Sequence, residues 1–165
     1  MNESQKVRCL IGIFIAGLVI SGFTAFPLQL ELEWLSGARG LNDPAHIEAA
    51  SGFDKWILTV RNGLRDTYAK YPWMGYGTDW LAFAHLVIAL FFIAPLIDPV
   101  RNIGAIYAGL AACVLVIPLA LICGHIRQIP FGWRLIDCSF GAFGALPLLY
   151  ALKLTKAITH GRSSA

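Results

Sequence analysis

Charge is the scarcest property of this sequence. Only 14% of the 165 residues are charged, whereas 57% are hydrophobic and the mean hydropathy is +0.64. Soluble domains carry about 25% charged residues, so this chain lacks the polar side chains that would cover a globule in water. The composition therefore excludes a soluble domain, a disordered chain and a disulfide-stapled secreted module, and it predicts a membrane protein.

Basic runs and metal-binding motifs are also missing. The net charge is only +3 and the basic residues form no cluster, so no nucleic-acid partner is indicated. The four cysteines contain no CxxC pair, and no HExxH motif occurs, which removes the usual signatures of zinc and thioredoxin-like sites. No cofactor is evident from motifs. Whether Cys123 and Cys138 form a disulfide across the short loop between them stays open.

Four apolar stretches are long enough to cross a membrane. We expect spans at about 9–30, 80–97, 103–123 and 135–152, because about 20 apolar residues cross a ~30 Å hydrocarbon core. The first stretch is interpreted as a retained span and not as a signal peptide, since the bulky Phe23 occupies the −3 position of the candidate cleavage point. The predicted fold is an all-α, four-helix transmembrane bundle that forms a single integral membrane domain over 1–165.

The long connection between the first two spans predicts an amphipathic helix over about 44–71. Asp43 and Pro44 are typical of an N-cap followed by proline at the first helical position. Apolar residues then recur at helical spacing, with polar residues on the other face: Phe53, Trp56, Ile57, Val60, Leu64, Tyr68 and Tyr71. Such a helix lies on the membrane or caps the bundle.

Membrane lipids are the expected partners, and a homo-oligomer or a larger membrane complex is a further possibility. The first span contains two small-xxx-small pairs, Gly12 with Ala16 and Gly17 with Ser21, which allow a second helix to approach closely. That second helix belongs either to this bundle or to another chain. Basic residues near the span ends favour a cytoplasmic location for both termini.

Titratable side chains inside a span are costly and indicate a functional site. His85 in the second predicted span and Asp137 near the start of the fourth are therefore candidate catalytic residues. His85 could act as acid and base because imidazole titrates near neutral pH, or it could be a neutral ring bonded to a neighbouring helix. Asp137 could instead pair with Arg134 or Arg127 and fix the loop before the last span.

The same spans predict two kinds of ligand site. An apolar cavity would be lined by His85, Phe83, Phe91, Phe92, Tyr107, Phe140 and Phe143, with Arg127 and Arg134 binding a lipid headgroup at its end. A haem between His85 and His125 is an alternative that their different depths in the spans disfavour, because both axial nitrogens must reach one iron.

The second span and its surroundings carry a family resemblance. The relevant segments are Ala82-Phe83-Ala84-His85-Leu86-Val87-Ile88-Ala89-Leu90-Phe91-Phe92, Arg101, Ile106-Tyr107 and Val116-Ile117-Pro118-Leu119. With four spans and a long first connection, the chain resembles the EXPERA domain, the family of the emopamil-binding sterol isomerase and the sigma-2 receptor. The resemblance implies an apolar cavity in which an acidic residue contacts a cationic amine. His85 falls at the position of that acid and lacks its fixed negative charge, so the resemblance concerns architecture only.

These patterns predict a small multi-pass membrane protein without a catalytic centre of its own. It would be an accessory or structural subunit of a membrane complex, or a module that binds a lipid or a pigment. One alternative is an enzyme or transporter that acts on an apolar substrate near the outer leaflet, with His85 as acid and base. A haem protein is the second alternative.

Overall fold

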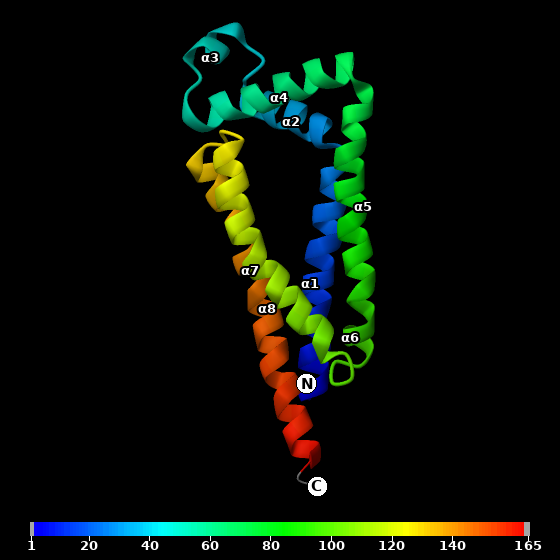
Figure 1. Cartoon of the computed structure of the whole chain (residues 1–165). Helices are drawn as coiled ribbons and strands as arrows, with labels where there is room; N and C mark the ends of the chain where they lie inside the picture. The colour runs from blue at the N-terminus through cyan, green and yellow to red at the C-terminus, as the bar shows by residue number, and fades with distance from the viewer. Residues whose placement is uncertain (1, 164–165) are drawn as a thin grey trace. The chain divides into compact units, whose positions relative to one another are not determined.

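A computed structural model describes residues 2–163, and every regular element in that range is a helix (Figure 1). The elements are α1 (Glu3–Ala25), α2 (Leu28–Ala38), α3 (Pro44–Ala49), α4 (Gly52–Lys70), the 3₁₀ helix η1 (Pro72–Gly75), α5 (Tyr76–Phe91), α6 (Ile93–Ile97), α7 (Ile103–Ile126) and α8 (Phe131–Ser163). The predicted all-α class is confirmed.

Four helical segments are long and apolar enough to cross a membrane. They cover Glu3–Ala25, Pro72–Ile97, Ile103–Ile126 and Phe131–His160. By length and composition they agree with an integral membrane protein with four spans. The first predicted span, about 9–30, overlaps helix α1, which ends at Ala25, and the chain turns at Phe26 and Pro27 before α2. The fourth helix is longer than predicted, since a helix continues into polar residues where its apolar stretch has ended.

The chain divides into two compact units. One unit contains Met1–Leu18 and Val87–Ala165, and we call it the hairpin unit. The other contains Val19–Leu86, and we call it the loop unit. Helices α1 and α5 contribute residues to both.

The hairpin unit is built on α7 and α8, which lie side by side and antiparallel (Figure 1). Glycines bring them close: a Cβ added at Gly109 of α7 would lie 2.9 Å from Leu148 Cδ1 of α8, and one at Gly141 of α8 would meet the backbone carbonyl of Cys113 of α7. Small residues allow such close approach of helices in membranes. The buried core of this unit consists of Val7, Ile11, Phe92, Ile106, Cys113, Leu148, Ala151 and Leu154.

The turn between α6 and α7 is held by side chain to backbone hydrogen bonds. Asp98 Oδ1 accepts a hydrogen bond from the Arg101 backbone N–H (3.1 Å), and Asn102 Nδ2 donates to the Asp98 carbonyl (2.9 Å). The Arg8 guanidinium donates to the Ile97 carbonyl (2.8 Å), which ties the start of α1 to the end of α6. These contacts satisfy backbone groups that would otherwise be free at the helix ends.

In the loop unit, α2 and α4 lie side by side (Figure 1), and Ile57 and Leu58 of α4 are buried. The amphipathic helix expected over 44–71 is present as two helices, α3 and α4. The break has a conformational cause: Ser51 is extended (φ −140°, ψ 161°) and Gly52 adopts φ +53°, a left-handed conformation that an α-helix interior does not use.

Candidate functional site

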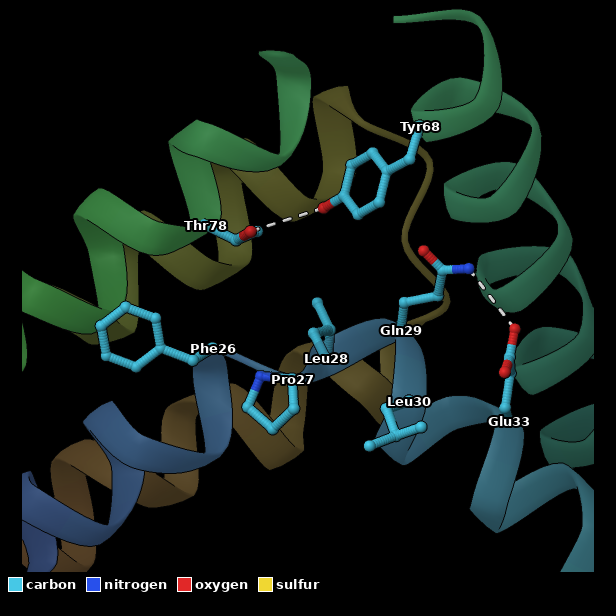
Figure 2. A pocket seen from close by; sticks show the side chains of 8 residues that line it. All are labelled: Phe26, Pro27, Leu28, Gln29, Leu30, Glu33, Tyr68 and Thr78. Atoms are coloured by element: carbon cyan, nitrogen blue, oxygen red, sulfur yellow. Dashed lines mark hydrogen bonds between the residues drawn. The ribbon is translucent and has the colours of Figure 1, made fainter. Parts of the chain in front are cut away.

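Two adjoining cavities lie in the loop unit, where the start of α2, the end of α4 and the start of α5 meet. The first has a volume of about 320 Å³ and is shown in Figure 2; it is lined by Phe26, Pro27, Leu28, Gln29, Leu30, Glu33, Tyr68 and Thr78. The second, of about 520 Å³, is lined by Phe26, Tyr68, Pro72, Trp73, Gly75, Tyr76, Thr78 and Asp79. Because they share Phe26, Tyr68 and Thr78, we treat them as one site and call it the Tyr68 pocket.

Two prolines shape this pocket. Pro27 precedes α2 with φ −89° and ψ 34°, and its carbonyl accepts the first α2 hydrogen bond, from the Glu31 N–H (2.9 Å). Pro72 opens η1, the short helix at which the chain turns from α4 into α5 (Figure 1). Proline lacks an N–H and so cannot donate a helical hydrogen bond to the preceding turn. Both prolines lie where one helix has ended and the next begins, and the chain changes direction at each.

Tyr68 is held in place by the turn that follows it. Its ring packs against Gly75, where an added Cβ would lie 3.5 Å from Tyr68 Cζ. Thr78 Oγ1 donates its proton to the Gly75 carbonyl (2.7 Å). The same oxygen lies 3.4 Å from the Tyr68 hydroxyl, the contact that is dashed in Figure 2. Since the Thr78 proton is used, Tyr68 donates to Thr78, and the Tyr68 oxygen keeps its lone pairs for another partner.

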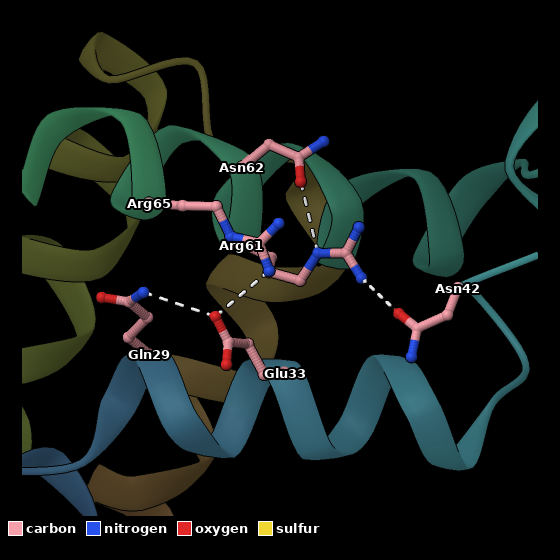
Figure 3. A network of polar contacts seen from close by, with 6 residues as sticks. All are labelled: Gln29, Glu33, Asn42, Arg61, Asn62 and Arg65. Carbon is pink, nitrogen blue, oxygen red and sulfur yellow. Dashed lines mark hydrogen bonds and ion pairs between the residues drawn. The ribbon is translucent and has the colours of Figure 1, made fainter. Parts of the chain in front are cut away.

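Glu33 on the wall of the pocket belongs to a polar network between α2 and α4 (Figure 3). Its Oε1 accepts hydrogen bonds from Arg65 Nη2 (3.2 Å) and Gln29 Nε2 (3.4 Å). The hydrogen bond from Arg65, followed by that from Gln29, holds the pKa of the Glu33 carboxyl below its usual value. Glu33 is therefore an ionised acceptor at neutral pH.

Further polar contacts fix the same pair of helices. Arg61 is buried, and its guanidinium donates to Asn42 Oδ1 (3.0 Å) and Asn62 Oδ1 (3.2 Å) (Figure 3). Arg39, which follows α2, forms an ion pair with Asp54 of α4, and this contact lowers the pKa of the Asp54 carboxyl. The wall of the Tyr68 pocket is thus anchored on α4 at several points.

His85, the first predicted site residue, lies on α5 in the loop unit. Its Nδ1 is 2.8 Å from the Leu81 carbonyl, and because a carbonyl oxygen only accepts, Nδ1 carries the proton in this bond. The sequence suggested an acceptor on a neighbouring helix, whereas Leu81 lies on the same helix as His85. Nε2 has no hydrogen-bond partner among the described residues, and a Cβ added at Gly22 would lie 3.1 Å from His85 Cβ.

Asp137, the second predicted residue, lies on α8 in the hairpin unit and forms no ion pair with any side chain that the structure describes (2–43 and 46–160). The expected pairing with Arg134 or Arg127 is absent. The Arg134 side chain runs back along α7 beside Gly124 and donates to the Leu121 carbonyl (3.4 Å), with its guanidinium 5.3 Å from the Phe131 ring centre. Gly124 leaves room for this direction because it has no side chain.

The remaining predicted residues divide between the two units. Phe83 is in the loop unit, where it packs edge-on against Trp80 (5.9 Å). In the hairpin unit, Phe92 is buried against Phe14 (4.7 Å) and Tyr107 lies under the Lys156 ammonium (5.4 Å). Three more rings of that unit are largely exposed: Phe91 (72%), Phe140 (64%) and Phe143 (70%). Rings exposed to this degree lie on the outside of the unit and do not enclose a cavity within it.

The haem alternative places its two ligands in different units, His85 in the loop unit and the exposed His125 at the end of α7 in the hairpin unit. Among residues 2–163, no group of three or more His, Cys, Asp or Glu side chains could hold a metal ion. Cys123 and Cys138 are free thiols, and Cys138 Sγ is directed to the Ile117 carbonyl (3.9 Å).

The Tyr68 pocket was missed in the sequence because its walls come from three separate segments. In the sequence, Tyr68 fits the apolar face of an amphipathic helix, and nothing around Gln29 indicates a site. The usable signals were Pro27 at the end of one apolar stretch and the Tyr71–Gly77 segment, rich in aromatic residues and glycine, before the next.

Comparison with family models, curated proteins and solved structures gives no match for this chain. The resemblance to the EXPERA domain therefore stays a hypothesis, and function has to be argued from the geometry.

Proposed function

We propose that this protein is a four-helix transmembrane bundle that binds a membrane lipid in the Tyr68 pocket and has no catalytic centre of its own. The observation that carries this proposal is the lining of the pocket, in which apolar side chains surround a few fixed polar groups. Small-molecule sites have this composition and volumes of about 300–1,000 Å³.

The position of the pocket along the chain favours a lipid over a water-soluble ligand. Two of the apolar helices end beside it, α1 at Ala25 and the span Pro72–Ile97 at Pro72. Trp73 and Tyr76 next to the pocket are 68% and 61% exposed, and exposed Trp and Tyr at span ends are typical of the headgroup region. A lipid could thus place its head in the pocket while its chains stay in the bilayer.

The α2–α4 pair supports the same placement. Leu30 and Trp34 are one helical turn apart on α2 and are 67% and 74% exposed. An apolar stripe of this kind beside a polar partner helix is typical of helices that lie in the membrane interface. We propose that α2 contacts lipid there and that both chain termini lie in the cytoplasm.

Native mass spectrometry of the protein purified in mild detergent tests this function. We expect about one lipid per chain for the unmodified protein, and loss of that lipid in Thr78→Trp, which fills the pocket. Thr59→Trp is a matched control, because Thr59 lies on α4 outside the lining and its hydroxyl also donates to a backbone carbonyl. Absence of lipid from the unmodified protein, or equal lipid in both variants, would contradict the proposal.

His85 gives a second candidate function. Its Nε2 has no partner within the described part of the chain although the residue lies inside a span, and such a group can relay protons. In this alternative the protein is an enzyme or transporter for an apolar substrate. It fails if His85→Ala leaves ligand binding and any measured turnover unchanged.

The same preparation separates the remaining roles. A protein that co-purifies in fixed stoichiometry would indicate an accessory subunit of a membrane complex. A Soret band that is lost in His85→Ala and His125→Ala would indicate haem.

A further inference from the structure

We infer that the lipid in the Tyr68 pocket carries an uncharged, hydroxyl-rich head group, as in a glycosyl diacylglycerol. This inference rests on the proposed lipid-binding function and names the class of head group. It follows from the charge, the hydrogen-bonding capacity and the aromatic rings of the lining.

The charge of the lining excludes an anionic head group. No lysine or arginine lines either cavity, whereas Glu33 and Asp79 both do. Arg65 is bonded to Glu33 and is not itself part of the lining. A lipid phosphate would find no cation to bind in this lining, and the two carboxylates could not donate a hydrogen bond to it.

A cationic head group would have to compete with Arg65 for the Glu33 carboxylate. Glu33 is neutralised by its ion pair with Arg65 (3.2 Å). Asp79 lies in the first turn of α5, at the positive end of the helix dipole. Both carboxylates thus offer hydrogen-bond acceptors, and that of Glu33 already has a cationic partner.

The polar groups of the lining mostly need donors. Glu33 Oε2 and Gln29 Oε1 have no partner among the described residues, because Gln29 uses Nε2 and Glu33 uses Oε1 in their mutual bond. Tyr68 donates its proton to Thr78 and keeps acceptor capacity. Hydroxyl groups of a sugar or a glycerol supply the donors that these acceptors lack.

Aromatic rings complete the match. Phe26, Trp73 and Tyr76 line the pocket and are exposed by 43%, 68% and 61%. The negative ring faces attract the C–H groups on one side of a sugar ring. A phosphate or a simple acyl chain would not use these faces and the acceptors together.

Binding to short-chain lipids tests the inference. The full-length protein is purified in a polyoxyethylene detergent, which carries no sugar, and is titrated with dioctanoyl forms of glucosyl diacylglycerol, phosphatidylcholine and phosphatidylglycerol. Native mass spectrometry counts the bound lipid. We expect the glucosyl lipid to bind about tenfold more tightly than either phospholipid, a difference that requires one or two additional hydrogen bonds.

Conservative variants locate the binding. Tyr68→Phe and Gln29→Met should each weaken the glucosyl lipid about fivefold, since each removes one hydrogen bond, and should thereby reduce its advantage over phosphatidylcholine. Tyr71→Phe is the matched control, because Tyr71 lies three residues beyond Tyr68 and lines neither cavity.

Failure of the inference and failure of the proposed function are distinguishable. Equal binding of all three lipids, or preference for a phospholipid, with loss of lipid in Thr78→Trp, would overturn the head-group class and leave lipid binding in place. Binding of none of them, together with no lipid in the unmodified protein, would overturn both.

Discussion

Single glycines set how closely the helices of the hairpin unit approach. At Gly109, an added Cβ would lie 2.6 Å from Phe92 Cζ and 2.9 Å from Leu148 Cδ1, whereas at Gly104, earlier on α7, it would meet nothing within 4 Å. The same residue type therefore has a packing role at one position and none at the other. Hydropathy does not distinguish the two.

Replacing these glycines with alanine should separate the two roles. Gly109→Ala should lower the free energy of unfolding by about 1–3 kcal/mol, because the Phe92 and Leu148 side chains must move. Gly104→Ala should be neutral or stabilising by up to about 1 kcal/mol, because alanine favours a helix. Unfolding in mixed detergent micelles, followed by circular dichroism, measures both, and equal effects would argue against the packing role of Gly109.

At the scale of elements, ion pairs join α2 and its following turn to α4. Arg65 with Glu33 and Arg39 with Asp54 both connect this pair and both lower the pKa of the carboxyl. A carboxyl with a lowered pKa in the folded state stabilises the fold above its unfolded pKa, about 4, and loses that contribution as the pH falls through the folded-state value.

Acid should therefore loosen α2 from α4. We expect hydrogen exchange of the α4 amides, corrected for its intrinsic pH dependence, to rise below about pH 4, with a modest effect because the side chains involved are largely exposed. High salt should weaken the pairs in the same way. A variant with both Arg39→Gln and Arg65→Gln should lack this acid transition, and a transition of the same size in that variant would show that the ion pairs are not its cause.

At the scale of the whole molecule, the proposed orientation makes a topological prediction. An even number of spans places Asn2 and the α6–α7 turn at Asn102 on one side, and Lys55 of α4 and Gln128 after α7 on the other. Single cysteines at these positions, in a chain whose four native cysteines are replaced by alanine, report the side of the membrane.

With cytoplasmic termini, an impermeant maleimide should label Lys55→Cys and Gln128→Cys in intact cells. Asn2→Cys and Asn102→Cys should react only after permeabilisation. The opposite pattern would reverse the orientation, and labelling of Asn102→Cys together with Gln128→Cys would refute a span between them.

Much of the helical structure could be predicted from the sequence, because the length of an apolar stretch depends only on neighbouring residues. The stretches beginning at Trp80 and Ile103 lie within helical spans, and Gly52–Lys70 is amphipathic as expected. Element ends were less accessible. The break before α4 depends on the positive φ of Gly52, and nothing in a run of hydrophobic letters marks it.

The candidate site was predicted less well. His85 and Asp137 are predicted site residues because a titratable side chain inside a span is costly. In the structure, His85 bonds to the Leu81 carbonyl of its own helix. Asp137 has no ion pair among the described side chains. The Tyr68 pocket escaped because Phe26, Tyr68 and Thr78 are ordinary residues when considered one at a time. They form a site only because the fold brings their side chains together around one pocket.

The sequence by itself determined where this protein can reside, since its scarce charge and four apolar stretches suit a bilayer and not water. The tertiary structure decided which polar groups meet. Helices α2 and α4 place Glu33, Gln29 and Tyr68 around one hollow, because the chain turns at Pro27 and again at Pro72. Whether a segment can enter a bilayer depends on how many apolar residues it contains, which the sequence gives directly. A binding site depends on the distances between residues far apart in the chain, and only the fold sets those distances.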